Sequence, residues 1–482
     1  MAVVSAGAIS VDANIITVTN TNDSGPGSLR QALVDVHDGD TIDLAVTGTV
    51  RLTSGGLLIA KNVTISGPGS NQLSIDGNQA ILVFGVFPGR IAAISGLTIR
   101  NAEAGAGVWN EQGTLTVSNC AVTSNSYEGV FNNKGTLTLN NCVLSGNSGT
   151  GLSAYFGVTT VRNCVVTGNS SGGLVNDGPN HGPLAPNDPT GSPPSMTIVD
   201  STISDNSGPG VSNVAGFLMV LDSTLSGNSA GEASSGGGIM SGPSFKTPAD
   251  VTIINSTISD NSAPDFGGGI AGGSWGVTII NSTVSGNSAG DSGGGIAGGF
   301  VRIMNSTISG NSAANSGGGI AALYSQFLVT IDNSTFTGNS AASGGGIYNA
   351  ERLEIIDTIL NAGASGENIF NNGGTIISHG YNISSDDGGG YLNGPGDQID
   401  TDPLLGPLQD NGGPTVTHAL SPGSPAIDTG DPNFTPPPFY DQRGCPFVRV
   451  FNGRIDVGSF EAQPLRRPCS APRPRPTPPP RP

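Results

Sequence analysis

Apolar and polar positions alternate in short runs along most of this chain, and the alternation changes phase at recurring places. In one representative stretch Val251 and Ile253 occupy alternate positions, and this period of two predicts a β-strand with one buried face. The phase breaks at Asn255, after which Ile258 returns to the buried face, and a Gly-rich run leads to a third buried position at Ile270. Gly, Ser, Asn and Thr dominate, so helix propensity is low. The pattern predicts three short strands separated by bends.

The bends follow an octapeptide, (N/D)-(S/C)-x-(hydrophobic)-(S/T)-x-N-S, which occurs nine times between Asn119 and Ser340. Its copies begin at Asn119, Asn141, Asn163, Asp200, Asp222, Asn255, Asn281, Asn305 and Asn333. Successive copies lie 22 to 37 residues apart, and 22 is the recurring minimum. A fixed minimum lengthened only by insertions is typical of a solenoid. The sequence therefore predicts an all-β fold, a single-stranded parallel β-helix with one repeat per coil.

Coils stacked about 4.8 Å apart place each residue above its counterpart in the next coil. The counterparts of Ile270 are Val108, Val130, Leu152, Leu174, Val211, Ile239, Ile296, Ile320, Ile347 and Ile369. A polar column is formed by Asn125, Asn147, Asn169, Asn206, Asn228, Asn261, Asn287, Asn311 and Asn339. Stacked amides can hydrogen-bond along such a column, and Asn also tolerates the left-handed backbone of a sharp bend. The Asn-Ser-Thr sequences at 255, 281, 305 and 333 also match the acceptor motif for N-glycosylation. We favour the stacking as the explanation of these sequences.

The first coil of a solenoid exposes apolar side chains and backbone groups, so we expect a cap at the N-terminal end. Helical spacing within residues 28–36 is carried by Leu29, Ala32, Leu33 and Val36. Ser28 and Gln31 fit a capping box, and Gly39 follows as a stop signal. The sequence predicts a lid helix here, followed by the first strands at 41–44, 62–65 and 96–99.

The five cysteines form two groups. Cys120, Cys142 and Cys164 occupy a buried position that is Ser in later coils, and we expect them to be buried free thiols, with a disulfide between adjacent coils as the alternative. Cys445 and Cys469 are the better candidates for a disulfide. No Cys-x-x-Cys motif or nearby His pair indicates a thiolate metal site.

The charge of the chain limits the partners that it can bind. The net charge is -18, from 18 basic and 36 acidic residues. Five arginines lie in the C-terminal tail, which leaves 13 basic and 36 acidic residues, a net charge of -23, in residues 1–465. Such a surface disfavours nucleic acid and anionic lipid and favours cations or neutral glycans. The sequence contains no apolar run long enough to form a transmembrane segment.

Two segments resemble known bacterial families. Residues 16–33, ITVTNTNDSGPGSLRQAL, and coils such as STISGNSA resemble bacterial right-handed parallel β-helix proteins, including polymorphic outer membrane proteins. Residues 401–431, TDPLLGPLQDNGGPTVTHALSPGSPAIDTGD, with DQRG at 441–444 and GRIDVGSFE at 453–461, resemble the choice-of-anchor Q domain. The resemblance implies a right-handed, pectate lyase-like β-helix and an extracellular or cell-surface location. It implies no assigned reaction.

These observations predict five segments. Residues 1–15 form a leader or disordered N-terminus, and residues 16–100 form the cap and first coils. Residues 101–375 form the repeats, 376–462 the choice-of-anchor Q-like region, and 463–482 a Pro/Arg-rich disordered tail. The tail, CSAPRPRPTPPPRP, has neither an apolar helix nor a sorting motif, so release or passive association with a wall stays open beside anchoring.

The repeats contain no recognisable catalytic motif. Between residues 101 and 350 the basic residues are Lys134, Arg162, Lys246 and Arg302, at different coil positions. His181 and His379 each precede Gly, but neither has the acidic and basic context of a polygalacturonase. We therefore predict no catalytic residues and no cofactor. The alternative is a polysaccharide lyase or glycoside hydrolase acting on acidic or neutral polysaccharide.

Two groups of side chains are candidates for binding. Asp386, Asp387, Asp397, Asp400 and Asp402 lie among glycines and are candidate Ca²⁺ ligands, although no EF-hand spacing is present. The alternative, which we favour, is a polar loop whose Asp residues cap turns. The candidate glycan-binding residues are Trp109, Phe131, Trp275, Tyr324 and Tyr348, outward-facing rings able to stack on sugars. The alternative is that loops of neighbouring coils cover these rings.

We therefore expect a non-catalytic extracellular or cell-surface scaffold that acts in adhesion or glycan binding. Its expected partner is a polysaccharide or cell-surface glycan. The outward positions vary between coils and lack the regular Thr array that an ice-binding solenoid requires.

Overall fold

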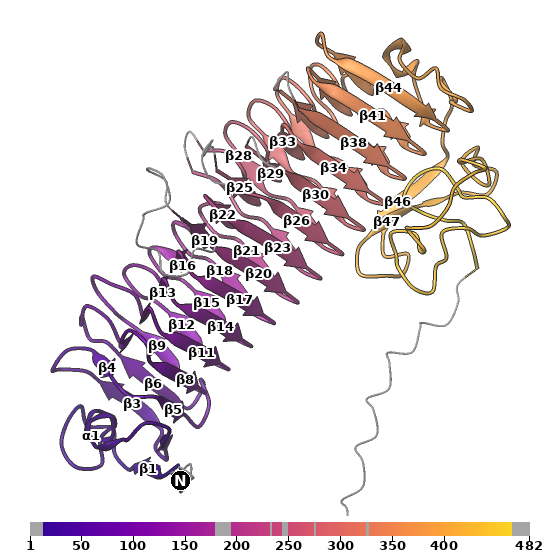
Figure 1. The fold of residues 1–482 in the computed structure, drawn as a ribbon. Coiled ribbons are helices and arrows are strands. Elements are labelled where there is room, and N and C mark those ends of the chain that lie inside the picture. The colour runs from indigo at the N-terminus through magenta and orange to yellow at the C-terminus, as the bar shows by residue number, and fades with distance from the viewer. Residues whose placement is uncertain are drawn as a thin grey trace, which may run out of the picture. The chain divides into compact units, whose positions relative to one another are not determined.

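Successive coils contribute strands to three parallel sheets, A, B and C, as the alternation predicts, except that the first coil has a strand in sheet A alone and the last has none in sheet C. Figure 1 shows the strands of neighbouring coils lying side by side. The computed structural model describes residues 13–178, 194–231, 234–242, 249–273, 276–323 and 327–464. The chain divides into an N-terminal unit, residues 1–252 with 258–277, and a C-terminal unit, residues 253–257 with 278–482. The predicted all-β parallel β-helix is confirmed in both units.

In the N-terminal unit the sheets are built as follows. Sheet A contains β1 (Ile15–Val18), β2 (Thr41–Leu44), β5 (Val63–Ser66), β8 (Ile91–Ser95), β11 (Thr114–Ser118), β14 (Thr136–Asn140), β17 (Val158–Arg162), β20 (Ser195–Val199) and β23 (Phe217–Leu221). Sheet B contains β3 (Gly48–Arg51), β6 (Leu73–Asp76), β9 (Thr98–Arg100), β12 (Ala121–Thr123), β15 (Val143–Ser145), β18 (Val165–Thr167), β21 (Thr202–Ser204) and β24 (Thr224–Ser226). Sheet C contains β4 (Leu57–Ile59), β7 (Phe84–Val86), β10 (Val108–Glu111), β13 (Val130–Asn133), β16 (Thr150–Tyr155), β19 (Gly172–Asp177), β22 (Val211–Asn213), β25 (Ile239–Ser241) and β29 (Ile270–Ala271). β28 (Ser262–Ala263) is a short additional strand, and β26 (Val251–Ile254) and β27 (Thr257–Ser259) contain residues of both units.

The C-terminal unit repeats the arrangement and adds an antiparallel pair. Sheet A contains β30 (Val277–Ile280), whose first residue belongs to the N-terminal unit, β34 (Val301–Met304), β38 (Leu328–Asp332), β41 (Arg352–Ile356) and β44 (Thr375–Gly380). Sheet B contains β31 (Thr283–Ser285), β35 (Thr307–Ser309), β39 (Thr335–Thr337), β42 (Ile359–Asn361) and β45 (Ile383–Ser384). Sheet C contains β33 (Ile296–Gly298), β37 (Ile320–Ala322), β40 (Ile347–Asn349) and β43 (Ile369–Asn371). The remaining elements are the short strands β32 (Ser288–Ala289) and β36 (Ser312–Ala313), the 3₁₀ turn η1 (Gly388–Gly390), and the antiparallel strands β46 (Leu405–Gln409) and β47 (Thr417–Leu420). β44 and β45 stack on the preceding coil, so the helix continues past the predicted boundary at residue 375.

The buried Asn column holds the coils in register. In the N-terminal unit the side-chain amide of Asn147 donates to Asn169 Oδ1 at 2.9 Å, and its own Oδ1 accepts from the side chain of Asn125 at 2.9 Å. The same Oδ1 also accepts from the Asn125 backbone amide at 3.1 Å. In the C-terminal unit Asn287, Asn311 and Asn339 repeat the pattern with side-chain bonds of 2.9 Å. The predicted column is therefore confirmed within each unit.

The left-handed bends lie beside this column and not in it. The residue that opens each octapeptide has a positive φ, as in Asn119 and Asn141. The residue preceding the column Asn also has a positive φ, as in Ser124 and Gly146. The expectation that the column Asn supplies the left-handed backbone is wrong, because its amide must face the interior to reach the next coil.

The Ser or Cys of the octapeptide forms a second ladder. Backbone amides donate to the Ser Oγ of the next coil, as from Cys164 to Ser201 at 3.1 Å and from Ser201 to Ser223 at 3.1 Å. Cys142 donates in the same way to Cys164 Sγ at 3.4 Å. The three early cysteines are buried free thiols, as predicted. Cys445 is disulfide-bonded, and its predicted partner Cys469 lies outside the described residues.

The predicted lid helix is present as α1 (Leu29–Asp35). Ser28 caps it, because its Oγ accepts the backbone amide of Gln31 at 3.2 Å. The reciprocal half of the capping box is absent, since the Gln31 side chain instead donates to Asp35 at 2.8 Å. Leu29 and Ala32 are buried as expected, whereas Leu33 is only partly buried.

Residues 403–464, here called the C-terminal region, cover the outer face of sheet B in the C-terminal unit. Gln442 binds two stacked threonines, donating to Thr283 Oγ1 at 2.9 Å and accepting from Thr307 Oγ1 at 2.6 Å. The backbone amide of Ser459 donates to Thr335 Oγ1 at 3.0 Å. Apolar contacts complete the interface, in a cluster of Ile359, Ile383, Leu420, Ala426, Val457 and Phe460. The three threonines are therefore buried, although the same octapeptide position is partly exposed in β21 and β24.

Replacing a column Asn tests its role in stability. We expect Asn147→Ala to lower the free energy of unfolding by about 3 kcal/mol, because the Asn125 amide and the Val122 carbonyl lose buried partners. Thermal unfolding followed by circular dichroism measures this. Thr138→Ala, a partly exposed position on β14, is the matched control and should cost less than about 1 kcal/mol. Equal melting temperatures for the two variants would contradict a structural role for the column.

Candidate functional site

Three aromatic rings from consecutive coils form a stack on the outer face of sheet C in the N-terminal unit. Alternation buries Val108 and Asn110 on β10 and turns Trp109 outward. Trp109 pairs in register with Phe131 on β13, and their ring centroids lie 4.4 Å apart with a 47° interplanar angle. Phe131 in turn contacts Tyr155 on β16, with centroids 5.4 Å apart. All three side chains are partly exposed. We call Trp109, Phe131 and Tyr155 the aromatic strip.

A carboxylate is fixed at one edge of the aromatic strip. Glu111 accepts hydrogen bonds from Trp109 Nε1 at 3.1 Å and from Asn133 Nδ2 at 2.9 Å. Gln112 donates to it as well, at 3.2 Å. Burial opposes ionisation of Glu111, but these donors outweigh it, so its pKa lies below the usual value. The strip thus presents rings beside a pre-oriented negative charge.

Further acidic groups lie around Tyr155. Burial, followed by the negative charges of Asp177 and Glu128, raises the pKa of the Tyr155 phenol. Asp177 is its register partner on β19. Burial also raises the pKa of Glu128. Lys134 Nζ lies 5.6 Å from the centroid of the Phe156 ring and interacts electrostatically with Glu111.

The strip contains two of the five predicted glycan-binding residues, Trp109 and Phe131. Its third member, Tyr155, was not predicted. Tyr348 lies elsewhere, in the C-terminal unit, where its ring stacks on Phe370 with centroids 5.5 Å apart. Trp275 and Tyr324 lie outside the described residues, as does His181. Tyr155 escaped the sequence analysis because it occupies the second outward position of its strand, opposite Asn133.

Charged side chains gather on the outer face of sheet A in the C-terminal unit. Glu354 on β41 accepts from Arg352 Nε at 2.8 Å and pairs with His379 Nε2 at 3.1 Å. Hydrogen bonds from His379 and Arg352 lower the pKa of Glu354. Burial raises the pKa of nearby Asp332, and the positive charges of Arg302 and His379 oppose that rise. The sequence analysis missed this group because its members come from four different strands.

Four of the five candidate Ca²⁺ ligands accept hydrogen bonds from nearby amide or hydroxyl groups. Asp386 and Asp397 each accept four hydrogen bonds from amide and hydroxyl groups. Asp387 and Asp402 each accept the backbone amide two residues ahead, at 2.9 Å. Asp400 adopts a positive φ of 51°. The structure does not gather these five carboxylates into one set of ligand atoms within 4.8 Å of one another.

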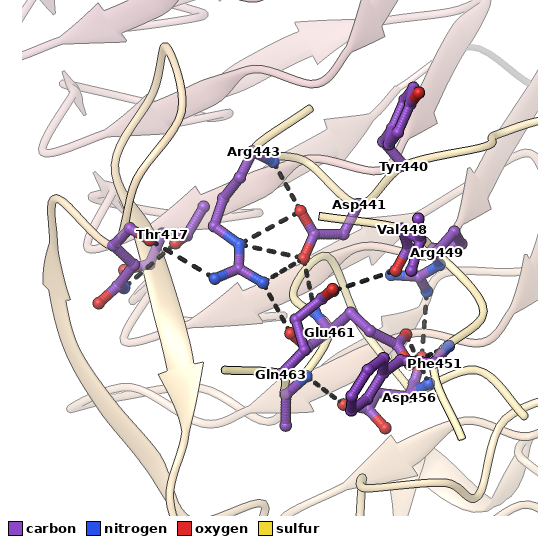
Figure 2. A network of polar contacts seen from close by, with 12 residues as sticks. Thr417, Tyr440, Asp441, Arg443, Val448, Arg449, Phe451, Asp456, Glu461 and Gln463 are labelled. Carbon is purple, nitrogen blue, oxygen red and sulfur yellow. Dashed lines mark hydrogen bonds and ion pairs between the residues drawn. The ribbon is translucent and has the colours of Figure 1, made fainter. Parts of the chain in front are cut away.

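One such carboxylate group does occur among the described residues, formed by Asp428, Asp456 and Glu461. Its oxygens accept backbone amides: Glu461 Oε2 from Asp456 at 3.0 Å, and Asp456 Oδ1 from Asp428 at 2.7 Å. The guanidinium of Arg449, fully buried beside it, donates to Asn333 Oδ1 at 2.7 Å and supplies positive charge to Glu461 and Asp456. Figure 2 shows Arg449, Asp456 and Glu461 converging. We interpret this group as a structural clamp of the C-terminal region.

A buried ion pair lies beside the clamp. Arg443 Nη2 contacts Asp441 Oδ2 at 2.6 Å, and Glu461 donates its backbone amide to the same oxygen at 2.9 Å (Figure 2). The Arg443 guanidinium lies 3.7 Å from the ring centroids of both Phe447 and Phe460. Buried pairs of this kind need several partners to offset desolvation, and here the segments DQRG and GRIDVGSFE supply them to each other.

Comparisons with known proteins agree with this fold. A family model described as "Right handed beta helix region" matches residues 39–187 and 190–361. No curated protein sequence matches the chain. Among solved structures, pectate lyase Pel9A is similar over 93% of this chain and 96% of its own, at 14% identity and a TM-score of 0.37. The Azotobacter vinelandii mannuronan C-5 epimerase AlgE6 A-module covers 76% of this chain and 98% of its own, at 15% identity and a TM-score of 0.43.

A third similar structure is the catalytic domain of a GH87 alpha-1,3-glucanase in complex with nigerose. Its sequence is 12% identical to this chain, and the TM-score is 0.46. The match covers 79% of this chain and 70% of that structure's own chain. At such low identities and TM-scores, none of the three carries an argument about what this chain binds.

The clamp predicts a pH dependence of stability. Burial raises the pKa of Glu461 to about 8, despite the nearby Arg449, so the folded state holds a proton that the unfolded state has already lost. The stabilisation that Glu461 contributes is therefore fully present below the pKa that this residue has in the unfolded chain. It is lost as the pH rises toward 8. Between pH 6.5 and 8.5 we expect a loss of about 1–2 kcal/mol. The window starts at pH 6.5 because burial lowers the pKa of His418, which acts in the opposite direction at lower pH.

Thermal unfolding and proteolysis of residues 403–464 at the two pH values measure this loss. Glu461→Gln should remove most of the pH dependence, whereas Glu103→Gln, at an exposed position of the N-terminal unit, should leave it unchanged. A melting temperature of the C-terminal unit that rises between pH 6.5 and 8.5 would show that the proton is not held as described.

Proposed function

Since the chain belongs to the right-handed β-helix family, we propose that it is a non-catalytic extracellular or cell-surface scaffold that binds glycans through the aromatic strip. The observation that carries the proposal is the stack of three partly exposed rings on consecutive coils. Aromatic faces bind the polarised C–H groups of sugar rings. The coil spacing gives one ring per step along the axis, which suits a linear polymer.

The polar rim supports the same proposal. Glu111 offers acceptor oxygens and Asn133 an amide at the edge of the rings, and hydroxyl-rich ligands require such groups in fixed positions. The backbone beneath the strip is rigid, because Asn110 donates to Asn132 Oδ1 at 2.8 Å directly behind it. A preformed surface of this kind loses little conformational entropy on binding.

An extracellular or cell-surface location completes the proposal. It rests on the resemblance of residues 401–461 to the choice-of-anchor Q domain, and on a surface charge that disfavours nucleic acid. None of the helices in the described ranges has the length and apolar character needed to cross a membrane. The polymorphic outer membrane protein-like coils agree with a role in adhesion.

Removing single rings tests the proposed glycan binding. We expect Trp109→Ala and Tyr155→Ala each to weaken binding of oligosaccharides found in a glycan screen by about tenfold, because a stacking surface is lost. Calorimetric titration measures the affinity. In a Trp275→Phe background Trp109 is the sole Trp, so its fluorescence reports binding at the strip. Phe217→Ala removes a more exposed ring, on β23 of sheet A, and should leave affinity unchanged. Equal losses in all three variants would argue against the strip.

A second candidate function is that of a polysaccharide hydrolase or lyase. The observation favouring it is the charged group on sheet A, where Asp332 has a raised pKa beside the oriented pair of His379 and Glu354. An acid whose proton is held more tightly than usual, next to a potential base, is the arrangement that general acid–base catalysis needs. In such an enzyme Asp332 would protonate the leaving oxygen and His379 would act as the base.

Product formation separates the two functions. For the scaffold we expect neither new reducing ends nor unsaturated products from any polysaccharide in the screen, with or without Ca²⁺. Colorimetric assay of reducing ends and ultraviolet absorbance of unsaturated products measure this. Activity lost in both Asp332→Asn and His379→Gln, but kept in Asp291→Asn, would instead establish the enzyme and assign its site.

A further inference from the structure

The aromatic strip has a second outward column beside its first two rings. Register pairing aligns Glu111 with Asn133, Asn133 with Tyr155 and Tyr155 with Asp177 on four consecutive strands of sheet C. The column therefore has a carboxylate at each end and a ring and an amide between them. A sugar chain lying along the rings would meet a negative charge near both ends of the strip.

The carboxylate of Glu111 is built into the surface. Its oxygens accept hydrogen bonds from three side chains, those of Trp109, Asn133 and Gln112. Glu111 is also partly buried, beside the Trp109 indole. A negative charge fixed against an indole in this way can attract a cation placed over the ring. The charge stays fixed because moving Glu111 would break its bond with the indole N–H.

Basic residues are few in the described coils that carry the strip. Residues 101–178 contain two basic residues, Lys134 and Arg162. Arg162 lies on sheet A and pairs with Asp200 at 3.6 Å, away from the strip residues of sheet C. Lys134 is placed over the Phe156 ring. Three acids, Glu111, Glu128 and Asp177, thus face the strip against one lysine, so an anionic polymer would be repelled.

We propose that the strip selects a linear polymer of amino sugars with free ammonium groups over neutral and uronate polymers, an inference that rests on the proposed glycan binding. The apolar faces of the sugar rings stack on Trp109, Phe131 and Tyr155. The ammonium groups of the sugar residues at the two ends of the strip lie against Glu111 and Asp177, and those between them lie beside the aromatic rings. Uronates carry the wrong charge, and neutral sugars gain only the stacking.

Three oligosaccharides of equal length test the selectivity: a glucosamine oligomer, its fully N-acetylated form, and an oligogalacturonate. Titrations use the full chain with Trp275→Phe, so that Trp109 fluorescence reports the strip. At low salt the glucosamine oligomer should bind at least about tenfold more tightly than its N-acetylated form. This preference should shrink as salt is added, because charge pairing is screened. Oligogalacturonate should bind most weakly.

Charge-removing variants locate the selectivity. Glu111→Gln and Asp177→Asn should each weaken binding of the glucosamine oligomer by up to about fivefold, while the N-acetylated oligomer changes less than about twofold. Asp200→Asn, an exposed acid of the same unit, is the matched control and should change neither affinity. Thermal melting confirms that each variant folds.

The outcomes separate this inference from the proposed function. Ring-dependent binding without preference for the glucosamine oligomer, or with preference for oligogalacturonate, would overturn the selectivity alone. Selectivity that survives in both acid variants would overturn the assignment to Glu111 and Asp177. Binding of no oligosaccharide, here and in the wider screen, would overturn the glycan-binding function itself.

Discussion

The buried amide ladder is the interaction on which each unit depends. A parallel β-helix must stop every coil from sliding along or around its neighbour, and aliphatic columns alone permit such slippage because apolar contacts are not directional. The Asn side chains remove this freedom, because each Oδ1 accepts both a backbone and a side-chain donor from the adjacent coil. An unmade bond in the dry interior is costly, so only one register satisfies the whole column. The buried polar Asn side chains therefore specify the fold more sharply than the hydrophobic core does.

The same register creates the candidate site. Once coils are locked one above another, any side chain placed outward acquires a neighbour at strand spacing, and single aromatic residues become a continuous surface. Trp109 and Phe131 meet for this reason, and so do Tyr348 and Phe370 in the C-terminal unit. The scaffold thus turns a one-residue change per coil into an extended aromatic surface.

The sequence predicts the architecture well because the signal is repeated nine times. Strand number per coil, the buried columns, the lid helix and the free thiols all follow from local pattern. What escaped prediction depends on contacts between distant segments. Nothing local distinguishes Thr307, buried under Gln442, from Thr224, which is partly exposed. The charged group of Asp332, Glu354 and His379 is likewise assembled by coil stacking from separated residues. Tyr155 was not predicted because it lies in the second outward column of sheet C, whereas Trp109 and Phe131 lie in the first.

The way in which Gln442 bridges two stacked threonines constrains how this molecule can change over evolutionary time. Whole coils of the N-terminal unit can be duplicated or deleted with little penalty, since each coil contacts only its neighbours. In the C-terminal unit the same event would shift Thr283, Thr307 and Thr335 relative to the segment that covers them, and many bonds would be lost together. Length variation among descendants of this chain should therefore accumulate in the first unit, while the second keeps its number of coils.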